Sequence, residues 1–146
     1  MIIKRCDVRD LGDLIEALED WGECGEHPAI YARNTLVDYS TCLWFRAGMQ
    51  FLLFQKIGKG IYSAHIVGHS ATFKEAKDFI HTVGKYMFSA TDCESIWCFI
   101  DKNNKKLQRL CGLLRFKRVA EFPSREIFIY EFQKKHRTEE EKICHL

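Results

Sequence analysis

The chain has 146 residues, of which 47% are hydrophobic and 29% charged, and its formal net charge is +2. This length and balance predict one globular domain with a core of its own, and they exclude a disordered chain. So small a net charge gives no specific argument for nucleic-acid binding. The longest apolar run, 49–54, is interrupted by Gln50 and falls far short of the roughly 18 residues of a membrane span, so we expect no membrane association.

The N-terminal residues predict a short strand at 2–6 followed by two helices. The first helix begins at Asp7, and its apolar residues recur at the spacing of a helix that packs on one face: Leu11, Leu14, Ile15 and Leu18. Gly22 and Gly25 end this helix. A second short helix is expected over 29–36, directly after Pro28.

The middle of the chain predicts an antiparallel meander of three strands. Segments 41–45, 49–57 and 61–67 are rich in aromatic and other strand-favouring residues. The turn Gly58-Lys59-Gly60 joins the last two segments, and two apolar runs joined by a short glycine turn are a hairpin signal.

A long helix is predicted to begin at a capping box formed by Thr72 and Glu75. A further strand follows at 94–100. Because a helix connects the strand at 61–67 to this strand, the connection is a crossover, and we expect the two strands to be parallel neighbours.

The last third of the chain predicts another helix, from Asn103 or Asn104, and two strands at 116–122 and 126–132. The fold class is therefore α/β (α+β), with a single mixed, mostly antiparallel sheet of six or seven strands flanked by helices. We expect the helix from Thr72 and the helix from Asn104 to lie on opposite faces or ends of the sheet. The domain covers 1–132, and 133–146 form a charged C-terminal tail.

The segment from Asn104 to Phe116 resembles the pattern Asn-x-x-Ala-x-x-Leu-Tyr-x-x-x-Gly-Phe of the GNAT superfamily of acyl-CoA-dependent N-acyltransferases. The order of elements between Ile2 and Phe132 is similar as well. The resemblance implies that the fourth and fifth strands splay apart to admit the pantetheine arm of the cofactor. It also implies that the pyrophosphate lies at the start of the helix near Thr72, where free amides and the helix dipole favour anions.

The same resemblance implies a set of cofactor-binding residues: Ile66, Val67, Gly68, Ser70, Ala71, Thr72, Lys74 and Asn104. The family signature at the phosphate loop is Gln/Arg-x-x-Gly-x-Gly/Ala. Here Thr72 takes the place of the arginine, and Phe73 takes the place of a glycine that lets the backbone approach phosphate. We therefore expect binding of acetyl-CoA to be possible but weak, and we expect Phe73 to block the path or to pack inward with Ala76 and Ile80.

Three residues are candidates for catalysis under this resemblance. Cys111 stands where many members have a tyrosine that protonates the leaving thiolate, and its simpler role is that of a small buried side chain. His65 or Glu26 is the candidate general base, and His65 could equally be a strand histidine bonded to the backbone. Arg115 replaces a family glycine.

Two further patterns were weighed for binding chemistry. Cys24 and His27, with the doublet Cys144-His145, lack the spacing of a zinc site, so no metal is expected. Basic residues gather late in the chain: Lys102, Lys105, Lys106, Arg109, Arg115, Lys117 and Arg118. Such a run is typical of a solvated helix face, but it also suits an anion site for a phosphorylated ligand or an acidic partner.

Two functions are therefore compatible with the sequence. The departures at Thr72–Phe73, Cys111 and Arg115 favour a non-enzymatic GNAT-fold protein, similar to the small proteins of tailed phages that act in virion or head assembly, with a protein partner. The alternative is an acetyl-CoA-dependent N-acetyltransferase that acts on an amine. Binding of the cofactor is the property that separates the two.

The seven cysteines are odd in number, follow no disulfide framework and are preceded by no signal peptide, which predicts a reducing, cytoplasmic compartment, including the cytoplasm of an infected host. We predict that titration of the denatured, unreduced protein finds all seven thiols free. Five or fewer free thiols would contradict this expectation, because each disulfide removes two.

Overall fold

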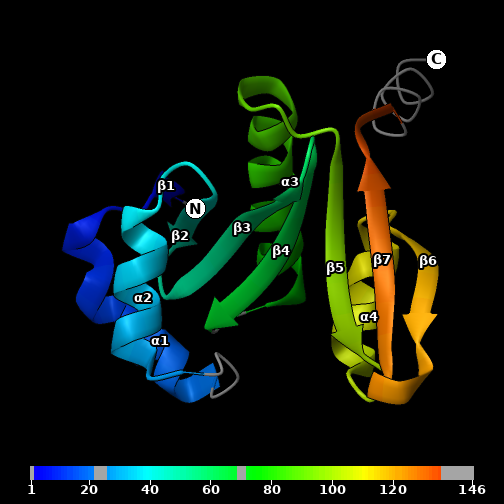
Figure 1. Cartoon of the computed structure of the whole chain (residues 1–146), viewed down its shortest axis with the longest axis horizontal. Coiled ribbons are helices and arrows are strands. Elements are labelled where there is room, and N and C mark those ends of the chain that lie inside the picture. The colour runs from blue at the N-terminus through cyan, green and yellow to red at the C-terminus, as the bar shows by residue number, and fades with distance from the viewer. Residues whose placement is uncertain (1, 22–25, 69–71, 136–146) are drawn as a thin grey trace.

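The computed structural model describes residues 2–21, 26–68 and 72–135, and its centre is a seven-stranded mixed sheet (Figure 1). The strands follow one another in space in the order β1-β2-β3-β4-β5-β7-β6. Their bounds are β1 Lys4–Arg5, β2 Cys42–Ala47, β3 Gln50–Gly58, β4 Ile61–Gly68, β5 Ser95–Asp101, β6 Lys117–Phe122 and β7 Ile127–Gln133. Only β4 and β5 pair in parallel, so the predicted fold class is confirmed.

The helices cover the sheet from both sides. After a short 3-10 turn, η1 (Val8–Asp10), helices α1 (Leu11–Trp21) and α2 (Pro28–Val37) pack on the face that carries Trp44, Leu53 and Val67. Helices α3 (Phe73–Ala90) and α4 (Lys105–Leu113) lie together on the other face and contact one another. A second 3-10 turn, η2 (Pro123–Arg125), separates β6 from β7.

The helices from Thr72 and Asn104 were expected on opposite faces or ends of the sheet, and the first of these two arrangements is wrong. Phe79 of α3 packs in one core cluster with Ile96 of β5, and the thiol of Cys111 on α4 interacts with that of Cys98, two residues further along the same strand. Side chains two residues apart on a strand point to the same face. Both helices therefore cover the same side of β5.

The separation of β4 from β5 is the main irregularity of the sheet. The two strands pair at Ile61↔Ser95, Tyr62↔Ile96 and Ser63↔Trp97, and no pairing follows among the described residues. Figure 1 shows the strands together at one end and diverging toward the other. The predicted parallel neighbours are confirmed, and the sheet opens where their pairing ends.

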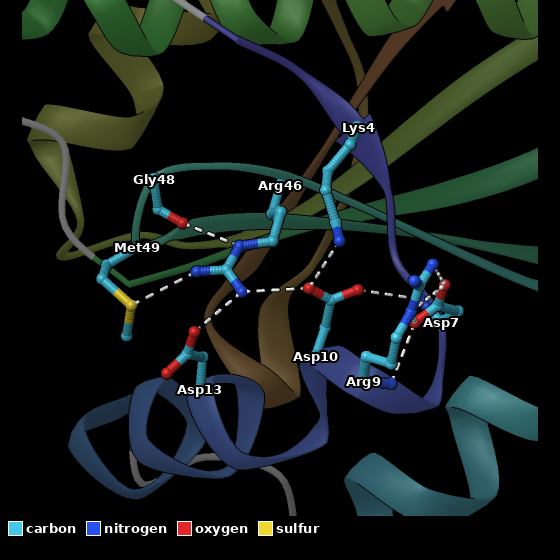
Figure 2. Close-up of polar contacts among 8 residues, drawn as sticks. All are labelled: Lys4, Asp7, Arg9, Asp10, Asp13, Arg46, Gly48 and Met49. Carbon is cyan, nitrogen blue, oxygen red and sulfur yellow. Dashed lines mark hydrogen bonds and ion pairs between the residues drawn. The ribbon is translucent and has the colours of Figure 1, made fainter.

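A buried carboxylate ties the N-terminal segment to the sheet (Figure 2). Asp10 is 4% exposed, and its Oδ1 lies 3.0 Å from Lys4 Nζ and 3.1 Å from Arg46 Nη1. The Asp7 amide donates to Asp10 Oδ2 at 2.9 Å. Arg46 also contacts the exposed carboxylate of Asp13 at 2.9 Å. Through these bonds, β1, η1, α1 and β2 form one unit.

Within the described ranges, no helix has the length and apolarity to cross a membrane. Five cysteines are described, and all are free thiols: Cys6, Cys42, Cys93, Cys98 and Cys111.

Replacing Asp10 by Asn is expected to lower the free energy of unfolding by about 2–3 kcal/mol, because it removes charge-assisted hydrogen bonds at a buried site. Burial alone would raise the pKa of Asp10, but hydrogen bonds from the Asp7 amide, Lys4 and Arg46 outweigh burial and lower it. The contribution is thus present above the ordinary carboxyl pKa of about 3.9 and is lost as pH falls through the lowered folded-state pKa. Urea unfolding between pH 2 and 7 measures both effects.

The matched control is Asp13→Asn, which removes the exposed carboxylate that contacts the same guanidinium. Its cost should stay below about 1 kcal/mol, as is typical of exposed ion pairs. Equal losses for the two variants would show that burial of Asp10 does not matter.

Candidate functional site

A cavity of about 1140 Å³ occupies the gap between β4 and β5. On one side it is lined by residues of α3 and α4, and on the other side it reaches Trp21 at the end of α1. Ala64 and Cys98, the residues next after the last strand pair, both line it. Because the strands carry no sheet partner here, the cavity is bordered by backbone amide and carbonyl groups that a ligand can bind.

Gly68 closes β4 at this site, and only glycine suits the position. Its φ is +93°, a conformation that side chains rarely adopt, and a Cβ there would overlap the carbonyl oxygen of Met49. Gly68 and Ile66 line the cavity, as their predicted role in cofactor binding requires. Val67 instead points into the core beneath α1 and α2.

His65 lines the cavity on the face that packs against α1 and α2, opposite Leu53 of β3. Its Nε2 lies 3.3 Å from the hydroxyl oxygen of Ser63, the residue two positions before it on β4. Burial lowers the pKa of His65 below its ordinary value. The ring is therefore neutral at pH 7 and has a lone pair with which to accept a proton.

Cys111 lines the same cavity from the α3–α4 side and is 3% exposed. Its thiol interacts with that of Cys98 on β5, and this interaction, together with burial, raises the pKa of Cys98 well above its ordinary value. Cys98 is thus protonated at pH 7 and is not activated as a nucleophile. Cys111 presents its thiol to the cavity, where the group can act as a proton donor.

The start of α3 forms one edge of the cavity. Thr72 caps the helix, and its hydroxyl accepts from the Glu75 amide at 3.1 Å. Phe73 lines the cavity and is half-buried, and its ring lies against α4, where the guanidinium carbon of Arg109 is 5.6 Å from the ring centroid. Of the two positions expected for Phe73, inward packing into the core is therefore not observed, and the ring borders the cavity. Lys74 is exposed and is not a lining residue.

Of the remaining predicted residues, some line the cavity, some do not, and some lie outside the described residues. Asn104 caps α4 by accepting from the Leu107 amide at 3.1 Å, and it lines the cavity. Glu26 is exposed ahead of α2 and is not brought together with His65 at the cavity. Ser70 and Ala71 lie outside the described residues, as do Cys24, Cys144 and His145 of the weighed metal pattern. Among the described residues, no group of three metal-ligating side chains occurs.

The cavity wall has a surplus of positive charge. Lys77 and Lys85 come from α3, Lys106 from α4 and Arg115 from the turn after it, while Asp101 is the single carboxylate among the described lining residues. A pocket lined in this way attracts anions. The basic run noted in the sequence therefore contributes to a pocket and is not only a solvated face.

Sequence analysis missed two lining residues, Cys98 and Lys77, and also Ser63, which contacts the lining residue His65. Ser63 could have been found, because residues two apart on a strand share a face with His65. Lys77 carries no signal of its own, since exposed helix lysines look alike until the partner helix is in place.

No protein-family model and no curated protein matches the chain. Solved structures do match. A chimera of the Vibrio cholerae spermidine N-acetyltransferase SpeG with hSSAT aligns with a TM-score of 0.76 and 11% identity over 93% of this chain and 98% of that one. A GNAT-family acetyltransferase from Bacillus cereus aligns with a TM-score of 0.67 and 14% identity over 91% and 96% of the two chains.

The Campylobacter jejuni N-acetyltransferase PseH in complex with acetyl coenzyme A aligns with a TM-score of 0.65 and 13% identity, over 91% of this chain and 99% of that one. These likenesses establish that the chain has the GNAT fold. They do not test the resemblance to phage proteins, which stays a prediction.

The turn after α4 explains why the family has glycine at the position of Arg115. The Phe116 amide donates to the Cys111 carbonyl at 2.9 Å, and the Arg115 amide donates to that of Gly112 at 3.1 Å, which is a Schellman motif. Such a motif needs a left-handed residue, and Arg115 has φ +68°. The observed conformation supports the alignment of this segment with the family pattern.

Replacing Arg115 by Gly should raise the free energy of unfolding by about 0.5–1 kcal/mol. This is the difference between left-handed strain of roughly 1–2 kcal/mol and the roughly 0.5–1 kcal/mol of chain entropy that glycine loses on folding. Chemical denaturation measures the change. The control is Lys117→Gly on the exposed strand β6, which should destabilise the protein; a loss at Arg115 as well would mean that this backbone is not strained.

Proposed function

We propose that this protein is an N-acetyltransferase that takes its acyl group from acetyl-CoA and transfers it to an amine. The observation that carries the proposal is the cavity at the opening between β4 and β5, with its surplus of positive charge. The GNAT fold supports it, because one structural neighbour is described in complex with acetyl coenzyme A.

The residues of the cavity fit such a cofactor. A chain of amides like pantetheine needs hydrogen-bonding groups along an extended path, and the unpaired backbone after Ser63 and Trp97 offers them. A polyanionic nucleotide needs cations at the wall, and Lys77, Lys106 and Arg115 provide them. The volume of about 1140 Å³ exceeds what a drug-sized ligand requires, as suits a ligand of this length.

When bound, the cofactor supplies an acyl group activated as a thioester. The chain's own residues then accept one proton and donate another. His65, neutral through burial, accepts the proton that the amine loses as its nitrogen forms the new C–N bond. Cys111 donates a proton to the sulfur as the C–S bond breaks, and Ser63 holds the imidazole through its hydroxyl.

The acceptor amine enters from the α1 side, where Trp21 and His65 line the cavity. The cofactor occupies the side of α3 and α4, where the lysines lie. This division places the amine and the thioester at the gap in the sheet, and it holds them in one orientation. Glu26, the other predicted base, is left with no part at the cavity.

A non-enzymatic role on the same fold is the second candidate. It is favoured by Thr72 and Phe73 at the start of α3, where the family has arginine and glycine, and by the absence of a tyrosine at Cys111. A virion-assembly role with a protein partner, in the cytoplasm of an infected host, would then follow as predicted from the sequence. The neighbours favour the enzyme over this role.

Calorimetry with acetyl-CoA at low salt should show saturable one-to-one binding, and Ala64→Leu should weaken it tenfold or more. Ala64 lines the cavity at the opening of the sheet, so the larger side chain occupies space the cofactor needs. Incubation with acetyl-CoA and a panel of primary amines should yield an acetylated product by mass spectrometry.

Ala47→Leu is the matched control, because Ala47 is also half-buried against the same core cluster but does not line the cavity. It should bind as the unchanged protein does. The absence of acetyl-CoA binding in a folded sample would reject the enzyme and leave the non-enzymatic candidate. Binding with no acetylated amine would point to a cofactor-binding protein without transferase activity.

A further inference from the structure

We propose that Arg109 of α4, held over the ring of Phe73, binds the diphosphate of the cofactor in place of a cation from the loop before α3. The inference rests on the proposed function. It assigns a binding role to two residues that neither the family pattern nor the neighbours identify.

The placement of the pair is the first argument. Phe73 is the first residue of α3 and lines the cavity, whereas Arg109 is not itself a lining residue and is linked to the cavity through the Phe73 ring. The guanidinium carbon of Arg109 is 5.6 Å from the ring centroid, within the range of a cation–π contact. Lys106, one turn earlier on α4, lines the same cavity.

In the part of the chain that the structure describes, no carboxylate lies within ion-pair distance of Arg109, Lys106 or Lys77. By contrast, Lys102, just before α4, pairs with Glu121 at 3.0 Å. These three cations therefore have no carboxylate partner among the described residues and can bind an anion, whereas Lys102 has such a partner.

The geometry of guanidinium suits this task. A guanidinium group against an aromatic ring keeps its N–H donors directed outward in the plane of the group, where they bind two phosphate oxygens at once. The ring also limits the motion of the exposed Arg109 side chain, so less conformational freedom is lost on binding. Phe73 then serves as a support for the phosphate-binding cation and does not obstruct the site.

This arrangement accounts for the departure at the phosphate loop. The family pattern would place arginine at Thr72 and glycine at Phe73, and here both are absent. An arginine is present beside Phe73 nevertheless, but it is Arg109 of the neighbouring helix α4. The contact between α3 and α4 makes the exchange possible.

The test compares Arg109→Gln with Arg118→Gln, using coenzyme A and inorganic pyrophosphate as calorimetric probes. Arg118 is also exposed and lies 4.3 Å from the centroid of an aromatic ring, that of Phe128, but this ring does not line the cavity, whereas that of Phe73 does. Arg109→Gln should lower the affinity for both probes tenfold or more and reduce the salt dependence of coenzyme A binding. Arg118→Gln removes the same charge and should change neither affinity by more than about twofold.

Two additional variants separate the possible explanations. Phe73→Leu keeps an apolar side chain without the ring, and it should lower the affinity for coenzyme A by a smaller factor than Arg109→Gln does. Tighter binding in Phe73→Leu would overturn the inference, because it would show that the ring obstructs the site. Ala64→Leu should lower the affinity for coenzyme A and leave the affinity for pyrophosphate unchanged, because the larger side chain fills only the gap between the strands.

The outcomes distinguish this inference from the proposed function. If coenzyme A binds and Arg109→Gln behaves like Arg118→Gln, the role of Arg109 is wrong and the proposed function stands. If neither probe binds the unchanged protein, both are wrong. Circular dichroism of each variant confirms that it is folded, and the exposure of Arg109 makes loss of fold an unsuitable explanation for its effect.

Discussion

The early end of pairing between β4 and β5 is the constraint on which the rest of this structure depends. The paired end is fastened by the amides of Glu94 and Ser95, which both donate to the Gly60 carbonyl, at 2.8 and 3.0 Å. Beyond the third pair the strands diverge, and the sheet becomes two halves. Helix α3 holds these halves at their angle, because its buried side chains Phe79, Val83 and Met87 belong to a core cluster that contains residues of both.

The opening creates both the site and its chemistry. Backbone groups that would otherwise form hydrogen bonds between strands face a cavity, and this cavity is lined by residues from both faces of the sheet. Each face contributes a different kind of residue. The side of α1 and α2 carries the neutral imidazole of His65, and the side of α3 and α4 carries the thiols and the cations.

Part of the site was predicted through the family resemblance. His65, Gly68 and Asn104 were all candidates under that resemblance, and all three line the cavity. The prediction was weaker for residues in loops. Glu26 is exposed and does not line the cavity, and no local pattern indicates where a loop carboxylate will point. For Phe73 the sequence left two positions open, across the phosphate path or packed inward, and the structure places its ring against a guanidinium group of the neighbouring helix α4.

The sequence by itself determined the order and type of the elements, the parallel pairing at the crossover and the caps at Thr72 and Asn104. These features depend on side-chain periodicity and on bonds within a few residues, which a linear pattern carries. Only the tertiary structure decided that α3 and α4 share a face, that Cys98 meets Cys111, and that Arg109 reaches Phe73. Each of these contacts joins different elements, so it exists only after the connections have set the direction and face of each one.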